Sequence, residues 1–132
     1  MAGLQEIATV GNVVTGASHV HRPWGWFTLL GEPDEMPIAA VKTITVEPGH
    51  ALSLQFHDHR RERWMPLSHG LVAEIGHEHH ELRPGHLYDI GIGVLHRLRN
   101  AGSSVGLLVE IMYGVYREDD IHRLDDHYGR TS

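Results

Sequence analysis

The close spacing of glycine and proline constrains the fold of this chain more than any other feature. The 132 residues include 15 glycines and 6 prolines, most of them at short intervals between Arg22 and Tyr116. Helices of ordinary length do not survive such spacing, whereas short β-branched and apolar runs bounded by turns are typical of strands. We therefore expect an all-β sandwich or barrel. The expected strands are residues 38–46, 51–56, 64–67, 71–75, 86–90, 95–99 and 105–113.

Composition excludes several classes of protein. The chain has no cysteine, so disulfides, thiolate catalysis and cysteine-bound zinc or iron–sulfur centres cannot occur. Its 17 acidic and 11 basic side chains give a formal charge of −6, which disfavours nucleic-acid binding. No stretch approaches the roughly 18 apolar residues of a membrane-spanning helix, and Met1 to Val14 lack a basic start followed by an apolar run. We expect a cytoplasmic protein with neither a membrane nor a nucleic-acid partner.

The length predicts a single domain. A chain of 132 residues can bury a core of its own and leaves no room for a second one. The segment before Val20 is mostly small and polar, so we expect residues 1–21 to form an N-terminal arm and residues 22–132 to form the domain. The charged tail from Tyr116 predicts a short C-terminal helix or an extended cover.

Histidine is abundant, with 13 residues in the chain. Imidazole is the commonest metal ligand and titrates near neutral pH, so this excess indicates a metal site, acid–base chemistry, or both. Two spaced motifs single out a few of the histidines. In the first, Gly49 is followed by Gln55, His57 and Glu62, and in the second, Gly85 is followed by Gly91, Gly93, His96 and Asn100.

These two motifs resemble those of the cupins, which read G-x5-H-x-H-x3-4-E-x6-G and G-x5-P-x-G-x2-H-x3-N. Three positions depart from that pattern: Gln55 replaces the first histidine, Gly91 replaces the proline, and Gly70 lies one residue late. The resemblance implies a double-stranded β-helix, or jelly-roll barrel, with its functional site inside the barrel.

Strand periodicity predicts which side chains share a face. Gln55, His57 and His59 have the same parity, so on one strand they would all point to one side of the sheet. After a bend, Glu62 can return a carboxylate, and His96 can close the site from a distant strand. Nitrogen and oxygen donors without sulfur suit one divalent metal ion, with zinc favoured and manganese, iron, nickel or cobalt as alternatives.

Further elements, in order along the chain, resemble the type II mannose-6-phosphate isomerase domain. That resemblance implies the metal ligands Gln55, His57, Glu62 and His96, and it accounts for the glutamine. Nothing before Arg22 resembles the nucleotide loop of the nucleotidyltransferase domain that often precedes this cupin, so we expect a stand-alone cupin without guanylyl transfer. The elements are R-P-W-G from Arg22, L-S-L-Q-F-H-D-H-R-R-E-R-W from Leu52, V-L-H-R-L-R-N from Val94, E-D-D-I-H-R-L from Glu118 and Y-G-R from Tyr128.

The resemblance implies a metal-dependent aldose–ketose isomerisation of a sugar phosphate through an enediol. Such a reaction needs an electrophile, a base and an anchor for phosphate. We expect His59 to be the base, with an additional ligand or a hydrogen-bond partner of a ligand as alternatives. Arg60, Arg22 and Arg97 are candidates for the phosphate, because guanidinium binds phosphate oxygens bidentately. Lys42, the only lysine, lies on a predicted strand among its polar positions and could bind substrate.

Two other functions stay open. A cupin that binds a metal or a sugar without turnover is favoured by Pro66, which fits a strand only at an edge or bulge, and by the late Gly70. A metal-dependent oxygenase could use His57, Glu62 and His96, although Gln55 disfavours it. The cluster at residues 77–80 is predicted to be an exposed hairpin turn and not the main metal site. The three tryptophans are expected in the core or at an interface, and we expect a homodimer.

Overall fold

The computed structural model describes residues 8–10, 13–15, 19–30, 37–126 and 129, and every regular element within these ranges is a β-strand. Two short hairpins come first in the chain. They consist of β1 (Ala8–Val10) with β2 (Val13–Thr15), and of β3 (His19–Arg22) with β4 (Gly25–Thr28).

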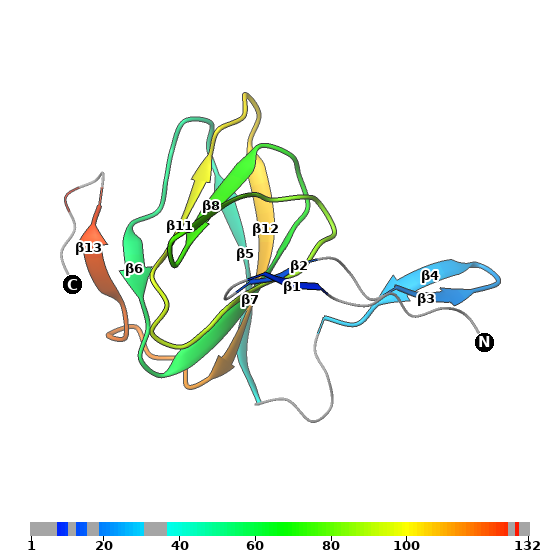
Figure 1. The fold of residues 1–132 in the computed structure, drawn as a ribbon, viewed down its shortest axis with the longest axis horizontal. Coiled ribbons are helices and arrows are strands. Elements are labelled where there is room, and N and C mark those ends of the chain that lie inside the picture. Colours follow the sequence, from blue (N-terminus) through cyan, green and yellow to red (C-terminus); the bar gives the residue numbers. More distant parts are fainter. Residues whose placement is uncertain (1–7, 11–12, 16–18, 31–36, 127–128, 130–132) are drawn as a thin grey trace.

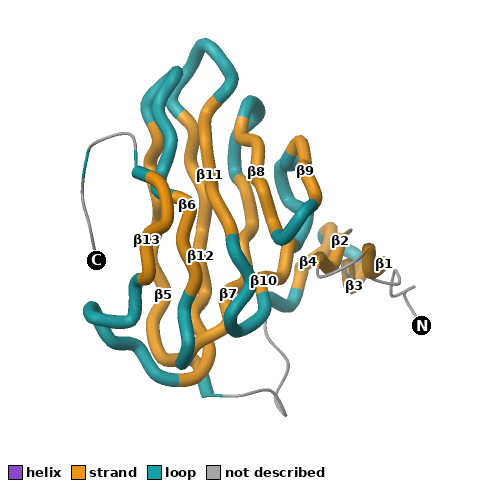
Figure 2. The backbone as a smooth tube through the Cα atoms, turned by 60° about the vertical axis from the view of Figure 1, so that its left-hand side comes forward, coloured by secondary structure: helices purple, strands orange, loops and turns teal. Residues whose placement is uncertain are grey.

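Two larger antiparallel sheets face each other and form the body of the molecule (Figures 1 and 2). The all-β prediction is therefore confirmed. One sheet has the order β10 (Tyr88–Ile90), β7 (Arg60–Pro66), β12 (Gly106–Gly114) and β5 (Ile38–Val46). The other has the order β13 (His122–Asp125), β6 (Leu54–Phe56), β11 (His96–Asn100), β8 (Leu71–Ile75) and β9 (Glu78–Glu81).

The core lies between the two sheets and follows the alternation of the sequence. On β8, Leu71, Ala73 and Ile75 are buried while the residues between them are partly exposed. Burying one face of each strand drives the two sheets together, at about 25 cal/mol for each Å² of apolar surface removed from water. The buried hydrophobic cluster comprises Val46, Trp64, Leu71, Ala73, Ile75, Leu82, Tyr88, Ile90, Leu98 and Leu108.

Glycines in the left-handed region form the turns that set the register of the two motifs. Gly93, with φ of 77°, lies in the turn that leads into His96 at the start of β11. Gly70, with φ of 96°, lies between β7 and β8, and a Cβ atom there would lie 3.0 Å from Cα of Gly102. The late position of Gly70 is thus accommodated by a turn that only glycine suits.

Three expectations can be compared directly with the structure. Residues 76 and 77 make the hairpin turn, but Glu78–Glu81 form β9 paired with β8, so the prediction of a turn over residues 77–80 is wrong. The charged tail contains a strand, β13, which corresponds to the extended alternative and not to a helix. The expected boundary between residues 21 and 22 falls inside β3. No helix of the described residues is long and apolar enough to cross a membrane.

Candidate metal centre

Three buried side chains from the two motifs converge between the sheets. Nε2 of His57 lies 3.5 Å from Oε2 of Glu62, and Nε2 of His96 lies 3.1 Å from Oε1 of Glu62. Glu62 belongs to β7 and His96 to β11, so the cluster joins the two facing sheets. One donor atom from each residue lies within 4.8 Å of the others, and each residue is at most 3% exposed.

Backbone carbonyls fix the tautomers of both histidines. Nδ1 of His57 donates to the carbonyl oxygen of Asp120 at 2.7 Å, and Nδ1 of His96 donates to that of Val94 at 2.9 Å. A neutral imidazole that donates through Nδ1 carries its lone pair on Nε2. Both rings therefore direct an acceptor nitrogen toward Glu62, and a backbone hydrogen bond of this kind is how metal-binding histidines are usually oriented.

The donor set fits a divalent metal ion. Nε2 of His96 and Oε1 of Glu62 are buried and have no hydrogen-bond partner, although they lie 3.1 Å apart. Two lone-pair atoms this close repel each other unless a proton or a cation lies between them. Two imidazole nitrogens and a carboxylate are donors that suit zinc and other first-row divalent metals.

The ionisation of the cluster is governed by the same contacts. Burial raises the pKa of Glu62, but the close contacts with His57 and His96 outweigh it and hold that pKa well below its usual value. Burial lowers the pKa of His96, and its close contact with the charge of Glu62 reverses this, so the net shift is upward. The carboxylate is therefore ionised at neutral pH and ready to bind a cation.

Gln55 and His59, the other two residues predicted to share the inner face, do not lie together in the structure. Gln55 on β6 is directly opposite His96 on β11, so its side chain lies on the same face of the sheet and beside the cluster. β6 ends at Phe56, and the chain bends at Asp58 and His59. His59 is exposed and does not share the inner face, so the predicted role as base has no support in its placement.

Of the three arginines predicted to bind phosphate, only Arg60 lies at the cluster. Its guanidinium is buried against Glu62, with Nε 3.4 Å from Oε2. Arg97 faces outward opposite Glu74 and pairs with Asp125 at 2.7 Å. Arg22 is exposed on the β3–β4 hairpin, which projects from the body in Figure 1.

A buried carboxylate that sequence analysis missed, Glu110, extends the cluster across the four-stranded sheet. Glu110 of β12 lies opposite Lys42 of β5 and Trp64 of β7. It is 3% exposed, accepts a hydrogen bond from Nε1 of Trp64 at 2.8 Å, and lies 3.5 Å from Nζ of Lys42. Lys42 shares its face with Ile44 and Val46, so the expectation that it lies on the polar side of the strand is wrong.

The surroundings of Glu110 destabilise its ionised form. Burial raises its pKa to about 7, and the charge of Glu62 adds to the rise, whereas Lys42 and the hydrogen bond from Trp64 oppose it. The signal in the sequence was a single carboxylate in the apolar run of residues 105–113. An acidic residue at an inward position of a buried strand requires a partner or a function.

The tail contributes two more residues to the site. Asp120 is buried and accepts hydrogen bonds from the backbone N–H groups of Asp58 at 2.8 Å and His59 at 2.9 Å, while its own carbonyl holds His57. Burial raises the pKa of Asp120, but those backbone hydrogen bonds lower it overall. Arg123 on β13 lies opposite Gln55, on the face that His96 also shares. Both residues lie in a charged stretch that resembles solvated surface in the sequence.

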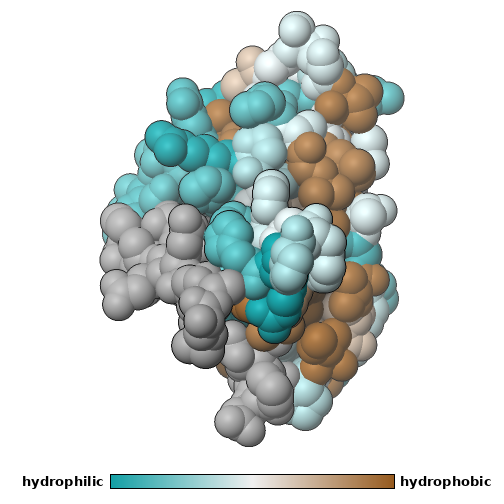
Figure 3. Space-filling view, turned by 90° about the vertical axis from the view of Figure 1, so that its right-hand side faces the viewer, coloured by the Kyte–Doolittle hydropathy of each residue, from teal (hydrophilic) through white to brown (hydrophobic). Residues whose placement is uncertain are grey.

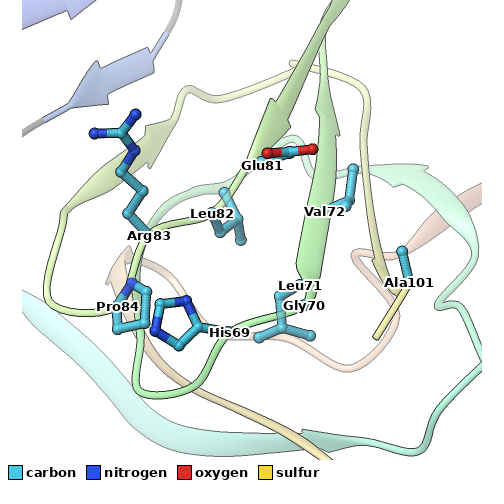
Figure 4. Close-up of a pocket in the computed structure, with 9 residues that line it drawn as sticks. All are labelled: His69, Gly70, Leu71, Val72, Glu81, Leu82, Arg83, Pro84 and Ala101. Carbon is cyan, nitrogen blue, oxygen red and sulfur yellow. The ribbon is translucent and has the colours of Figure 1, made fainter. Parts of the chain in front are cut away.

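A separate hollow lies away from the cluster. A cleft of about 670 Å³ opens beside β8 and β9, and Figure 4 shows Leu71, Leu82 and Pro84 along it with Arg83 and Glu81 at the margin. Its lining contains no buried ionisable group, and of the two motifs it includes only Gly70. Asp58, Asp120 and His122 form a second group with metal-ligand spacing, but Asp58 is exposed and Asp120 is already occupied by backbone N–H groups.

Two facing antiparallel sheets that enclose a His–Glu–His cluster define the chain as a cupin, which confirms the predicted fold. The crystal structure of NovW, a 4-keto-6-deoxy sugar epimerase from the novobiocin biosynthetic gene cluster of Streptomyces spheroides, has the same fold. It superposes with a TM-score of 0.74 at 12% identity, covering 93% of this chain and 75% of NovW. The chain belongs to the mannose-6-phosphate isomerase C-terminal family, whose family model matches residues 11–126.

Relatives of known name are much longer than this chain. It is 42% identical to the xanthan biosynthesis protein XanB of Xanthomonas campestris, over 97% of this chain and 29% of XanB. It is 40% identical to the alginate biosynthesis protein AlgA of Pseudomonas putida, over 86% of this chain and 23% of AlgA. The chain therefore spans less than a third of the length of either relative.

Proposed function

We propose that this cupin is a metal-dependent sugar-phosphate isomerase of the mannose-6-phosphate type, with zinc as the favoured metal. The observation that carries the proposal is the buried His57–Glu62–His96 cluster, whose unpartnered donor atoms face each other in a member of this family. Gln55, which lies beside His96, is proposed as the fourth ligand. A metal held there would act as a Lewis acid toward the substrate oxygens on which negative charge develops.

The residues of the chain supply the remaining chemistry of the proposed reaction. Isomerisation moves a proton between adjacent carbons, and Glu110 is our candidate to carry it, in place of the exposed His59. Its Oε1 is buried without a hydrogen-bond partner, and a group with a pKa of about 7 can both accept and donate a proton near neutral pH. Lys42 sits beside Glu110, half exposed, where it can bind the substrate.

Proton exchange with solvent tests the function. The metal-loaded protein is incubated with mannose 6-phosphate in deuterated water, and both fructose 6-phosphate and deuterium at C2 of the aldose are measured by NMR. We expect both products from the wild type and no exchange from Glu110→Gln. His57→Ala and His96→Ala should lose the metal, and unchanged metal content in these variants would refute the site.

A binding cupin without turnover is the second candidate, and the complete burial of the cluster favours it. Tight metal binding with no deuterium incorporation into any hexose phosphate would establish this alternative. Metal binding and proton exchange are therefore measured on the same preparation.

The proposal includes pairing with a second copy of the chain. Trp24 and Trp26 on the projecting β3–β4 hairpin are 73% and 58% exposed, so they belong to no core within one copy. β5 is an edge strand whose outward Val41 is 59% exposed. Figure 3 shows hydrophobic residues gathered along one side of the molecule. Exposed aromatic side chains and an exposed edge strand favour a dimer in which two chains bury these surfaces against each other.

A further inference from the structure

A buried guanidinium contacts the donor atoms of the candidate metal centre. Nε of Arg60 lies 3.4 Å from Oε2 of Glu62, and Nη2 of Arg60 lies 3.4 Å from Nε2 of His57. The side chain of Arg60 is 3% exposed. Arg60 therefore lies against two of the atoms that would bind a metal.

These contacts leave the guanidinium poorly satisfied. Nε and Nη1 of Arg60 are buried and have no hydrogen-bond partner, and its bond to His57 is long. Guanidinium has five N–H donors, and a buried charge with few hydrogen bonds is costly. Its outer contact is the ring of Tyr116, 5.2 Å from Cζ of Arg60 and 40% exposed. An anion with several acceptor oxygens would satisfy Arg60 better than its present partners do.

Arg60 and a metal ion cannot use the same donor atoms together. The lone pair on Nε2 of His57 faces Nη2 of Arg60, because Nδ1 donates to the backbone. A metal at this nitrogen would lie next to a side chain that keeps its positive charge at every physiological pH. The repulsion between a divalent ion and a guanidinium at such distances is large when both are buried.

We propose that Arg60 competes with the metal and exchanges partners when the metal binds. Arg60 would leave Glu62 and His57 when these residues hold a metal, and its guanidinium would then be free to bind the phosphate of the sugar phosphate. The inference deepens the proposed function and rests on its metal site and substrate class. It makes metal and sugar phosphate bind cooperatively, each raising the affinity for the other by the same factor.

Cobalt binding tests the competition without turnover. Co²⁺ is titrated into the wild type, Arg60→Met and Arg61→Met by calorimetry, and its ligand-field spectrum is recorded. Arg61 is the matched control, because it carries the same charge but packs on Tyr113 and pairs with Asp89 instead of the cluster. We expect Arg60→Met to bind Co²⁺ at least about tenfold more tightly than the wild type, and Arg61→Met to match the wild type.

A second titration tests the exchange of partners. Mannose 6-phosphate at saturating concentration should tighten Co²⁺ binding to the wild type and to Arg61→Met by about tenfold, and it should have little effect in Arg60→Met. Arg60→Gln removes the charge but keeps a polar side chain in the buried position, and the same result is expected. This variant replaces Arg60→Met if the latter does not fold.

The outcomes separate this inference from the proposed function. Equal or weaker Co²⁺ binding by both Arg60 variants, with wild-type binding intact, would overturn the competition and leave the metal centre standing. No Co²⁺ binding by any of the proteins would overturn both. Because no measurement depends on catalysis, a protein that shows tighter Co²⁺ binding in the Arg60 variants but no isomerisation would confirm the competition and refute the isomerase.

Discussion

The buried carboxyl group of Glu110, in the middle of the apolar strand β12, makes the stability of this protein depend on pH. The pKa of Glu110 rises to about 7 in the folded chain, against 4.5 for an ordinary glutamate. Between those values the folded state holds a proton on Glu110 that the unfolded state has lost, so the contribution of Glu110 to the free energy of unfolding falls as the pH rises. The decrease extends from about pH 4.5 to about pH 7 and amounts to about 3 kcal/mol.

Glu110→Gln should remove this decrease. Relative to the wild type, the variant should gain up to about 3 kcal/mol of stability at about pH 8 and little at about pH 5, because the amide is neutral throughout. Urea unfolding in the presence of a chelator measures both. Glu47→Gln is the control, since the side chain of Glu47 is 77% exposed and should show no such difference. A stability difference that is the same at both pH values would contradict the assignment.

At the scale of elements, local signals predicted the strands well and long-range contacts poorly. Turn glycines and alternating apolar residues act within a few positions, so β5, β8 and β12 fall close to their expected ranges. His59 was misplaced because parity holds only while a strand continues, and β6 stops at Phe56. Just beyond that end, the backbone N–H groups of Asp58 and His59 bond to Asp120 in the tail, far away in the sequence.

Asp120 should therefore be important for the stability of the loop after β6. Asp120→Ala leaves two buried or partly buried N–H groups without their charged acceptor, at a cost of about 2–3 kcal/mol in the free energy of unfolding. Asp119→Ala is the matched control, because Asp119 is exposed and pairs only with the neighbouring Arg117 in the described contacts. Urea denaturation of both variants gives the comparison, and equal stabilities would show that Asp120 does not hold the loop.

At the scale of the whole molecule, the two motifs singled out three side chains that lie buried together in the structure, because each motif's spacing is a property of local strands and turns. The neighbours of the cluster were not predictable in the same way. Glu110 and Arg123 join it only through strand pairing between distant segments. The exposure of Trp24 and Trp26 likewise becomes clear only in the structure, where their hairpin projects from the body.

Those two tryptophans should control the oligomeric state. We expect the wild type to sediment at twice the mass of one chain, and the double variant Trp24→Ser, Trp26→Ser to sediment as a monomer, because the apolar area that drives pairing is removed. Leu124→Ser is the control, since Leu124 is 61% exposed on β13, away from the hairpin. A wild type that sediments as a monomer at high concentration would refute self-association.

The position of the cluster between the two sheets also affects how long the folded molecule lasts. Glu62 and His96 belong to different sheets, so they can meet only when the sheets pack, and we expect that packing to come late in folding. An ion shared by them would therefore do little to speed folding and would mainly slow unfolding. Loss of that ion would shorten the lifetime of the native state without changing the rate at which it forms.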